Sequence, residues 1–177
     1  MNCGNFKKII ILAFLVILSG ALIVLSACSI TQNSVTQLLN SPAPDFNLKD
    51  LDGNDVKLSG LMGKTVLINF WKTTSPACVH DLPIFQELYN EWDGRGDVVF
   101  LSIDLGEGSA KVNDFVERRN YTFPVYMDTH WEAGRLYQIH AFPTTCLVDN
   151  QGYLRFFFAG PFQDRAVLDE KLADWLP

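Results

Sequence analysis

Cysteine is scarce in this sequence, with four residues in a chain of 177. Cys3 and Cys28 flank an N-terminal apolar run, which leaves Cys78 and Cys146 for the rest of the chain. Two thiols are too few for a network of disulfide bonds or for a zinc site made of cysteines alone. The sequence therefore excludes a small disulfide-stabilised scaffold.

An excess of basic charge is also missing, because 20 acidic residues outnumber 14 lysines and arginines. The net charge of −6 becomes −8 if the first 27 residues are removed, since two lysines and no acid are lost with them. This balance attracts neither nucleic acid nor anionic lipid, so we expect no nucleic-acid partner. The apolar share of 48% is that of an ordinary globular domain.

The N-terminus carries an export signal. Two lysines precede an uncharged apolar run over residues 9–25, which is typical of a signal segment. The residues Leu25-Ser26-Ala27-Cys28 resemble the lipobox of bacterial lipoproteins, which implies that residues 1–27 are a lipoprotein signal peptide and that Cys28 is lipidated. An uncleaved signal anchor is the alternative. Both interpretations place the protein outside the cytoplasm, attached to a bacterial cell membrane.

A polar segment separates this signal from the folded part. Residues 29–41 read SITQNSVTQLLNS, which is uncharged and aperiodic. We expect residues 28–41 to form a flexible tether and residues 42–177 to form one folded domain.

Strand and helix signals alternate through this domain. The apolar run over residues 65–70 is typical of a strand that is covered on both faces, and Asp52-Gly53 predicts a hairpin between two short strands. The predicted strands are 46–48, 56–58, 65–70, 98–103, 125–127, 144–148 and 153–158, and the predicted helices are 76–92, 109–119, 131–137 and 165–176. This order of elements indicates an α/β fold with a mixed central β-sheet flanked by helices.

Several ordered motifs resemble one protein family. They are Ala43-Pro44-Asp45-Phe46, the run from Gly63 to Trp71, Tyr121-Thr122-Phe123-Pro124-Val125, and Phe142-Pro143-Thr144-Thr145 followed by Leu147-Val148-Asp149 and Gly152. Together they resemble the TlpA/ResA group of the redoxin (AhpC/TSA) superfamily. The resemblance implies a thioredoxin-like fold with an N-terminal β-hairpin extension. It also implies an extracytoplasmic thiol:disulfide oxidoreductase that acts on exported proteins, including apocytochromes c, without a cofactor.

The sequence departs from this family at the catalytic motif. Where the family has W-x-x-x-C-P-P-C or a close variant, the segment from Trp71 to Cys78 reads WKTTSPAC, with Ser75 in place of the attacking cysteine. A thiolate displaces sulfur from a disulfide, whereas a serine hydroxyl without an adjacent base does not ionise. Ser75 followed by Pro76 instead predicts a helix start, with the hydroxyl accepting a hydrogen bond from the backbone N–H of Cys78.

Cys78 and Asp81 are the remaining candidates for the catalytic site. Cys78 begins an apolar stripe with Leu82, Phe85, Tyr89 and Trp92, which predicts that the thiol is at least half-buried. The resemblance matches Cys78 with the resolving cysteine of the family, and Asp81 with an acidic position near the dithiol. A solvated helix carboxylate is the alternative for Asp81.

The resemblance also implies a substrate groove beside a cis-proline at Pro143, with substrate-binding positions at Trp71, Pro76, Phe142, Pro143 and Thr144. Cys146 lies inside an apolar strand, where we interpret it as a core residue. A disulfide or redox pair with Cys78 is the alternative.

Histidines raise the question of a metal. His80, His130 and His140 together with Cys78 would suggest a copper site of a related redoxin branch, but the paired-cysteine motif of that branch is missing. We therefore expect no metal.

Three functions fit this sequence. The first is a thiol:disulfide oxidoreductase that is atypical or impaired because of Ser75. The second is a one-cysteine peroxidase that uses Cys78, and the third is a non-catalytic module that keeps the peptide groove beside Pro143.

Overall fold

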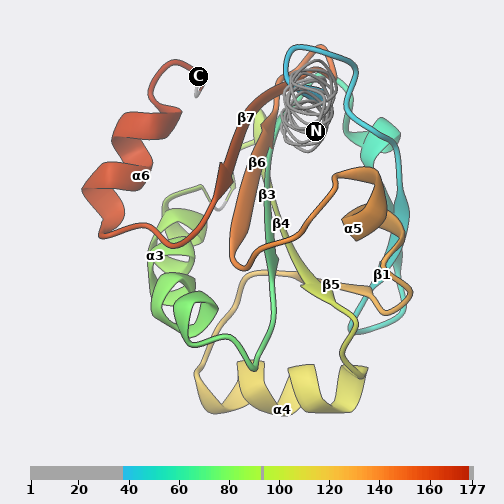
Figure 1. Ribbon diagram of the computed structural model, residues 1–177, viewed down its shortest axis with the longest axis vertical. Helices are drawn as coiled ribbons and strands as arrows, with labels where there is room; N and C mark the ends of the chain where they lie inside the picture. Colours follow the sequence, from blue (N-terminus) through green and yellow to red (C-terminus); the bar gives the residue numbers. More distant parts are fainter. Residues whose placement is uncertain (1–37, 93, 176–177) are drawn as a thin grey trace, which may run out of the picture. The chain divides into compact units, whose positions relative to one another are not determined.

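The computed structural model of the protein describes residues 38–92 and 94–175 (Figure 1). Its strands are β1 (Asn47–Asp50), β2 (Asp55–Lys57), β3 (Thr65–Trp71), β4 (Val98–Leu105), β5 (Val125–Asp128), β6 (Thr144–Val148) and β7 (Leu154–Ala159). Its helices are α3 (Pro76–Trp92), α4 (Ser109–Arg118), α5 (Glu132–Leu136) and α6 (Arg165–Leu172), with a short 3₁₀ helix, η1, at Leu58–Leu61.

The strands form one mixed sheet in the order β2-β1-β5-β4-β3-β6-β7. β3 and β5 lie parallel to β4, whereas β6 is antiparallel to β3 and β7 is antiparallel to β6. The predicted mixed sheet flanked by helices is therefore confirmed.

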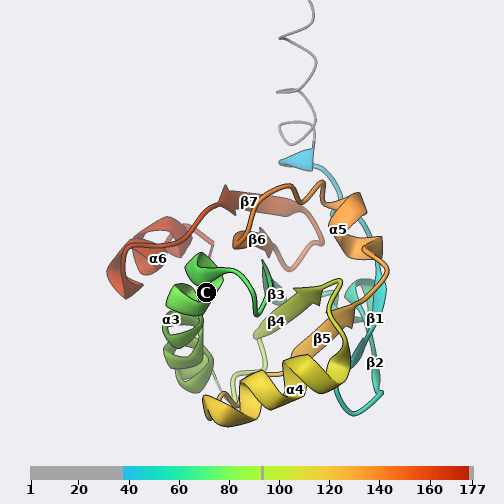
Figure 2. The same cartoon turned by 60° about the horizontal axis from the view of Figure 1, so that its bottom comes forward.

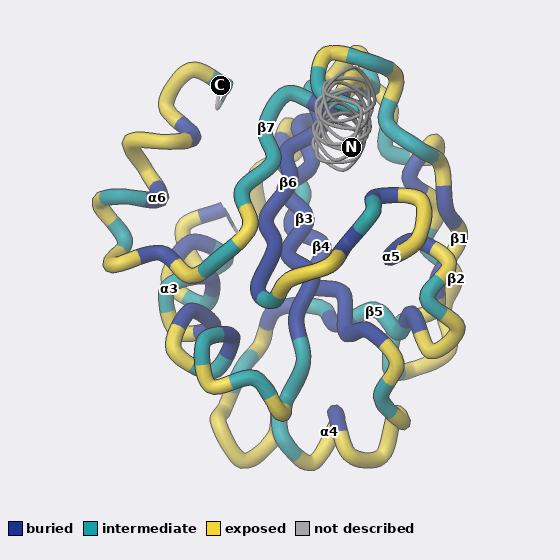
Figure 3. Tube along the Cα trace, viewed as in Figure 1, coloured by how far each residue is buried: buried dark blue, intermediate teal, exposed yellow. Residues whose placement is uncertain are grey.

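β3 is the centre of the sheet, and all seven of its residues are buried. Figure 3 shows β3 and its neighbours as the dark blue middle of the domain. Because β3 is covered on both faces, its sequence is apolar at successive positions instead of alternating with polar residues.

The two faces of the sheet carry separate hydrophobic clusters. One face packs against α3, α4 and α6, and its cluster includes Leu67, Cys78 and Val112. The other face packs against α5, and its cluster includes Ile68, Tyr137 and Cys146. Figure 2 shows α3, α4 and α6 on one side of the strands and α5 on the other. We call these the α3 face and the α5 face.

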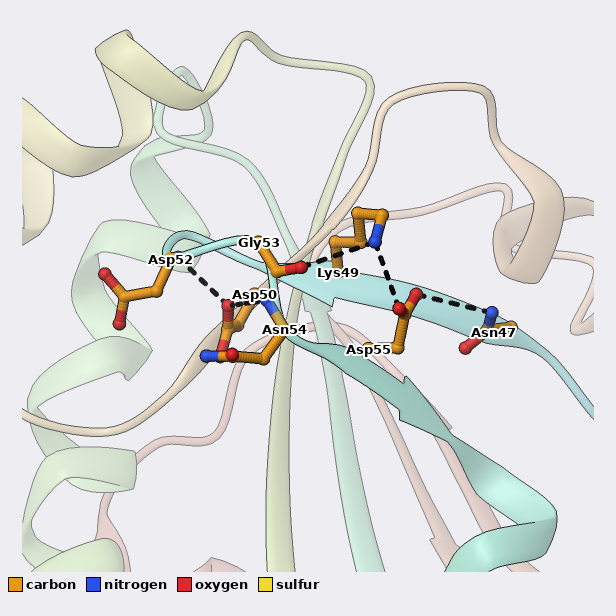
Figure 4. Close-up of polar contacts among 7 residues, drawn as sticks. All are labelled: Asn47, Lys49, Asp50, Asp52, Gly53, Asn54 and Asp55. Atoms are coloured by element: carbon orange, nitrogen blue, oxygen red, sulfur yellow. Dashed lines mark hydrogen bonds and ion pairs between the residues drawn. The ribbon is translucent and has the colours of Figure 1, made fainter.

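β1 and β2 form the predicted hairpin, and Leu48 pairs with Val56. Figure 4 shows the polar contacts of this hairpin and its turn. The carboxylate of Asp50 fixes the turn by accepting hydrogen bonds from the backbone N–H groups of Asp52 and Asn54, at 2.9 and 2.8 Å. An aspartate that binds backbone groups a few residues ahead is typical of such turns, and Gly53 supplies the positive φ of 90° that this turn requires. β1 also pairs with β5, so the hairpin extends the sheet at one edge.

The first described residues are attached to β7 and to the turn before it. The backbone N–H of Asn40 donates to the carbonyl of Leu154 at 2.7 Å, and that of Ala43 donates to Gly152 at 2.9 Å. Four residues of the expected tether, 38–41, therefore pack beside the domain. They lie at the end of the sheet where β6 ends, since Val148 pairs with both Val66 and Leu154.

Most differences from the predicted elements are shifts of one or two residues at their ends. The C-terminal helix differs more, because α6 ends at Leu172 instead of residue 176. Within the described residues, no helix is both long and apolar enough to cross a membrane. The predicted signal peptide and Cys28 lie outside the described residues.

Candidate active site around Cys78

The site is built where β3 ends and α3 begins. Four residues join Trp71, the last residue of β3, to Pro76, the first residue of α3. The Ser75 hydroxyl accepts a hydrogen bond from the backbone N–H of Cys78 at 3.3 Å, and the Ser75 carbonyl accepts one from Val79 at 3.0 Å. The predicted helix cap is therefore present, and it occupies the place where the family motif has a thiol.

Cys78 lies in the core of the α3 face with no exposed surface. Leu82, Phe85 and Trp92 of the predicted stripe are also buried, while Tyr89 is half-buried. Burial raises the pKa of the Cys78 thiol, and hydrogen bonding by the Ser75 side chain and the Lys72 backbone opposes this only in part. The thiol is thus protonated and inaccessible in this conformation, so it is a weak nucleophile at neutral pH.

Asp81 lies one helical turn further along α3 and has no exposed surface, unlike a solvated helix carboxylate. One carboxylate oxygen accepts a hydrogen bond from the backbone N–H of Phe162 at 3.1 Å, and the other lies 3.2 Å from Nδ1 of His80. Burial raises the pKa of Asp81, and hydrogen bonds from His80 and Phe162 partly offset it. Asp81 therefore connects α3 to the loop that leads into α6.

The loop before β6 contains a cis peptide bond between Phe142 and Pro143, as the family resemblance implied. The carbonyl of Pro143 accepts a hydrogen bond from Gly160 at 2.8 Å, so it is paired with the end of β7. Thr144 pairs with Phe70 at the C-terminal end of β3, which places this loop at the same end of the sheet as Ser75.

The predicted substrate-binding positions differ in accessibility. Pro76 is exposed and Phe142 is half-buried, whereas Pro143 is buried and Trp71 and Thr144 have no exposed surface. Pro76 and Phe142 are thus the two that a partner reaches without a change of conformation, and a substrate role for all five stays a prediction.

Lys72 adds a charged group that the sequence analysis did not assign to the site. Its ammonium lies 4.7 Å from the ring centroid of Trp131 and 5.2 Å from that of Phe142. The two rings meet edge to face, with centroids 5.8 Å apart. These contacts hold a cation beside the cis-proline loop.

Cys146 lies on the opposite face of the sheet from Cys78. It belongs to the cluster on the α5 face, pairs with Ile68 of β3, and is fully buried. Both cysteines are free thiols. Since the sheet separates them, the alternative of a Cys78–Cys146 disulfide does not fit this structure, and Cys146 is a core residue.

Two acids near the site, Asp104 and Glu107, were also missed. Glu107 accepts hydrogen bonds from the backbone N–H and the hydroxyl of Thr73, at 2.6 and 2.9 Å, and pairs with Lys111. Asp104 is fully buried near the end of β4 and pairs with Trp71 in the sheet. A charged residue inside the apolar run of β4 was the signal that could have identified Asp104.

The histidines do not form a metal site with Cys78. Over residues 38–92 and 94–175, no three histidine, cysteine, aspartate or glutamate side chains are arranged to hold a metal ion. The exposed side chain of His80 instead contacts Asp81.

The sequence profile of the AhpC/TSA family matches residues 39–157. The chain is 36% identical over 122 residues to the thiol-disulfide oxidoreductase ResA of Geobacillus kaustophilus, which covers 69% of this chain and 70% of the relative. Two solved structures are also similar. One is the exposed lipoprotein thioredoxin Etrx1 of Streptococcus pneumoniae, with 28% identity and a TM-score of 0.64 over 74% of this chain and 99% of that one. The other is StoA of Bacillus subtilis, with 26% identity and a TM-score of 0.63 over 72% of this chain and 96% of that one.

The two solved structures share the thioredoxin-like fold, and ResA and Etrx1 are named as a thiol-disulfide oxidoreductase and a thioredoxin. The β-hairpin, the helix start at Ser75 and the cis-proline loop are features of this chain that accompany the match. The chain therefore has a thioredoxin-like fold and belongs to the AhpC/TSA family.

Proposed function

We propose that this protein is a membrane-anchored, extracytoplasmic member of the family that binds exported thiol- or disulfide-containing proteins and exchanges thiols only slowly, at Cys78. The function rests on the family, on the loop beside cis-Pro143, and on the replacement of the attacking cysteine by Ser75. Apocytochromes c are one class of exported protein that fits this role.

The proposal depends on what occupies the two cysteine positions of the family motif, which are residues 75 and 78 in this chain. Ser75 uses its hydroxyl to cap α3, and Cys78 is buried with a raised pKa. A two-cysteine cycle needs an accessible low-pKa thiol and a second thiol to resolve the mixed disulfide. With one thiol, the mixed disulfide between Cys78 and its substrate is released only by an external thiol. A second thiol in the same motif would act at millimolar effective concentration, so turnover without it is slow.

Location is proposed from the sequence together with the relatives. Residues 1–27 serve as a lipoprotein signal peptide, Cys28 is lipidated, and the segment from 28 to the domain that starts near residue 42 is the tether. One structural relative is named an exposed lipoprotein thioredoxin, which supports a location on the outer side of the cell membrane.

The peroxidase alternative receives less support from the site. A peroxidatic cysteine needs a lowered pKa and access for peroxide, and Cys78 has a raised pKa and no exposed surface. Sulfenic acid formation at Cys78 after peroxide treatment is the measurement that would reverse this preference.

The experiment that tests the proposal is the Ser75→Cys variant, with Ser75→Ala as the matched control. We expect the purified full chain in detergent to reduce insulin slowly. We expect Ser75→Cys to raise this rate about a hundredfold or more, because the second thiol becomes intramolecular. Ser75→Ala loses the cap without adding a thiol and gains no activity. Rapid insulin reduction by the wild type, or no gain in Ser75→Cys, would overturn the proposal.

A further inference from the structure

An open pocket of about 470 Å³ lies between α4 and residues 72–75, the segment that we call the Ser75 loop. Figure 1 shows α4 below the point where β3 leads into α3. Because Thr74 lines the pocket and directly precedes Ser75, a partner that reaches the motif passes beside this pocket. We call it the α4 pocket, and its lining residues are Thr73, Thr74, Lys111, Asp114, Phe115, Arg118 and Arg119.

The charge of the α4 pocket is opposite to that of the whole chain. Three of its lining residues are cationic and one is acidic, whereas acidic residues outnumber lysines and arginines by 20 to 14 in the sequence. Lys111 pairs with Glu107, which lies just before α4. Arg118 donates from Nε to Asp114 at 2.8 Å. These two pairs balance two of the cations, so Arg119 leaves the pocket with a net positive charge.

Arg119 has no carboxylate partner within the described part of the chain. Its side chain is exposed, and its guanidinium lies over the ring of Phe115, 4.4 Å from the centroid. A guanidinium on an aromatic ring keeps N–H donors at its edge for a carboxylate, while the ring limits its orientations. Phe115 also packs against Trp71, with ring centroids 5.6 Å apart. The charged group is therefore held in place by an aromatic contact that leads directly to the motif.

The remaining lining residues define which side chain fits. Thr74 is exposed and offers a hydroxyl donor, and Phe115 is half-buried and offers an apolar surface. A carboxylate accepts strong hydrogen bonds from guanidinium and ammonium groups, and the methylene groups of a glutamate pack on an aromatic ring. A lysine or arginine in the same place would meet like charge. The α4 pocket therefore fits an acidic side chain.

We propose that the α4 pocket binds an acidic side chain next to the reacting cysteine of the partner protein, so that the chain prefers exported partners with an acidic segment at that place. The inference rests on the proposed function and adds the kind of partner sequence that the site prefers. The pocket acts before exchange, by holding the partner beside the Ser75 loop. Charges at the rim of an interface mainly change the association rate and its dependence on salt.

The exchange test uses the reduced full chain with Ser75→Cys and two synthetic peptides. Each peptide carries one cysteine as a mixed disulfide with a coloured thiol, followed by three glutamates in one peptide and three glutamines in the other. Release of the coloured thiol gives the rate, which is divided by the rate of the same peptide with dithiothreitol. We expect the glutamate peptide to react about fivefold faster at low ionic strength, and about 0.5 M salt should remove most of this preference.

Arg118→Gln together with Arg119→Gln in the same background should lower the preference to about one. The matched control is Lys49→Gln together with Lys57→Gln, which removes two charges from the β1–β2 hairpin, where both lysine side chains are 61% exposed. This control should keep the fivefold preference. Equal rates for the two peptides with Ser75→Cys alone would overturn the proposal. An equal loss of preference in the arginine and lysine variants would also overturn it, because the protein would then respond only to net charge.

A second measurement uses the wild-type chain and needs no exchange. Peptides with serine in place of cysteine are titrated into the nitrogen-15-labelled full chain in detergent, and backbone signals are followed by NMR. We expect the glutamate peptide to shift the signals of Thr74, Phe115 and Arg119 and to bind about threefold tighter or more than the glutamine peptide. Equal binding of the two peptides, or shifts confined to other parts of the domain, would overturn the proposal.

The two measurements separate this inference from the proposed function. If the glutamate peptide binds at the α4 pocket but Ser75→Cys gains no activity, the proposed function fails and the acidic preference of the pocket stands. If Ser75→Cys gains activity but treats both peptides alike, the α4 pocket has no such role and the proposed function stands.

Discussion

Both faces of the central sheet are covered by a hydrophobic cluster, but the two faces differ chemically. On the α5 face, Cys146 lies among apolar side chains. In the described part of the chain, the Tyr137 hydroxyl is the one buried side-chain polar atom on that face without a hydrogen-bond partner. The α3 face holds Cys78, the buried carboxyl groups of Asp81 and Asp104, and the buried polar side chains of Asn69 and Ser102. The two faces receive different residues because successive side chains of a strand point to opposite faces of the sheet. In β3, Leu67 and Trp71 belong to the α3 face, and Ile68 belongs to the α5 face.

This contrast distinguishes residues that core packing explains from residues that core packing does not explain. A cysteine in an apolar environment behaves as a small hydrophobic residue, which is sufficient to explain Cys146. Buried acids and unpaired polar atoms cost stability, so their concentration around Cys78 calls for a chemical role. The α3 face therefore places buried acidic groups on the same side of the sheet as the one thiol of the motif.

The largest expected difference between the faces is in access to the two thiols. Cys78 lies in the first turn of α3, where a local opening exposes it, whereas Cys146 lies in the interior of the sheet and requires global unfolding. We expect iodoacetamide to modify Cys78 roughly a hundredfold faster than Cys146 under native conditions, which corresponds to a difference of about 2.7 kcal/mol between the free energies of opening at the two thiols. Peptide mass spectrometry gives both rates. Equal rates in urea serve as the control, and equal native rates would remove the distinction.

A second expected effect concerns the buried carboxyl group that joins α3 to the α6 loop. Asp81→Leu leaves the backbone N–H of Phe162 without an acceptor and should lower the free energy of unfolding by about 1–3 kcal/mol. Asp81→Asn keeps a side-chain oxygen in place and should cost less. Urea denaturation measures both variants. If the two substitutions cost the same, the hydrogen bond to Phe162 does not stabilise the domain.

A third expected effect is a dependence of stability on pH. Asp104 has a raised pKa in the folded state, so its contribution to stability is complete below the unfolded pKa of about 3.9 and is lost as pH rises through the folded value. The stability difference between wild type and Asp104→Asn should therefore shift in favour of the variant from about pH 4 to about pH 9. Urea denaturation at a series of pH values measures it, and a difference that does not change with pH would contradict a protonated Asp104.

Local features of the fold could be predicted from the sequence because their causes are local. The apolar run at β3, the Asp52-Gly53 turn and the Ser75-Pro76 helix start each depend on neighbouring residues, and the structure contains all three. The cis-proline was expected from the family resemblance, which carries information that no local pattern holds.

The parts of the site that were missed depend on distant partners. Glu107 binds Thr73, 34 residues earlier, because β3 and β4 end side by side. The burial of Asp81 depends on Phe162, 81 residues later. Sequence patterns report which residues are apolar and which are charged, but these two contacts exist only after the sheet has assembled. The sequence pattern of a helix therefore does not tell whether a carboxylate on it, such as that of Asp81, is buried or solvated.

The hydrogen bonds of residues 38–43 to β7 have a directional consequence. They fix the first described residues at the end of the sheet where β6 finishes, and Trp71, Ser75 and the cis-proline loop lie at the other end, about seven residues of β3 or roughly 20 Å away. A tether attached on the N-terminal side would therefore pull on the end of the domain that lies opposite the Ser75 loop.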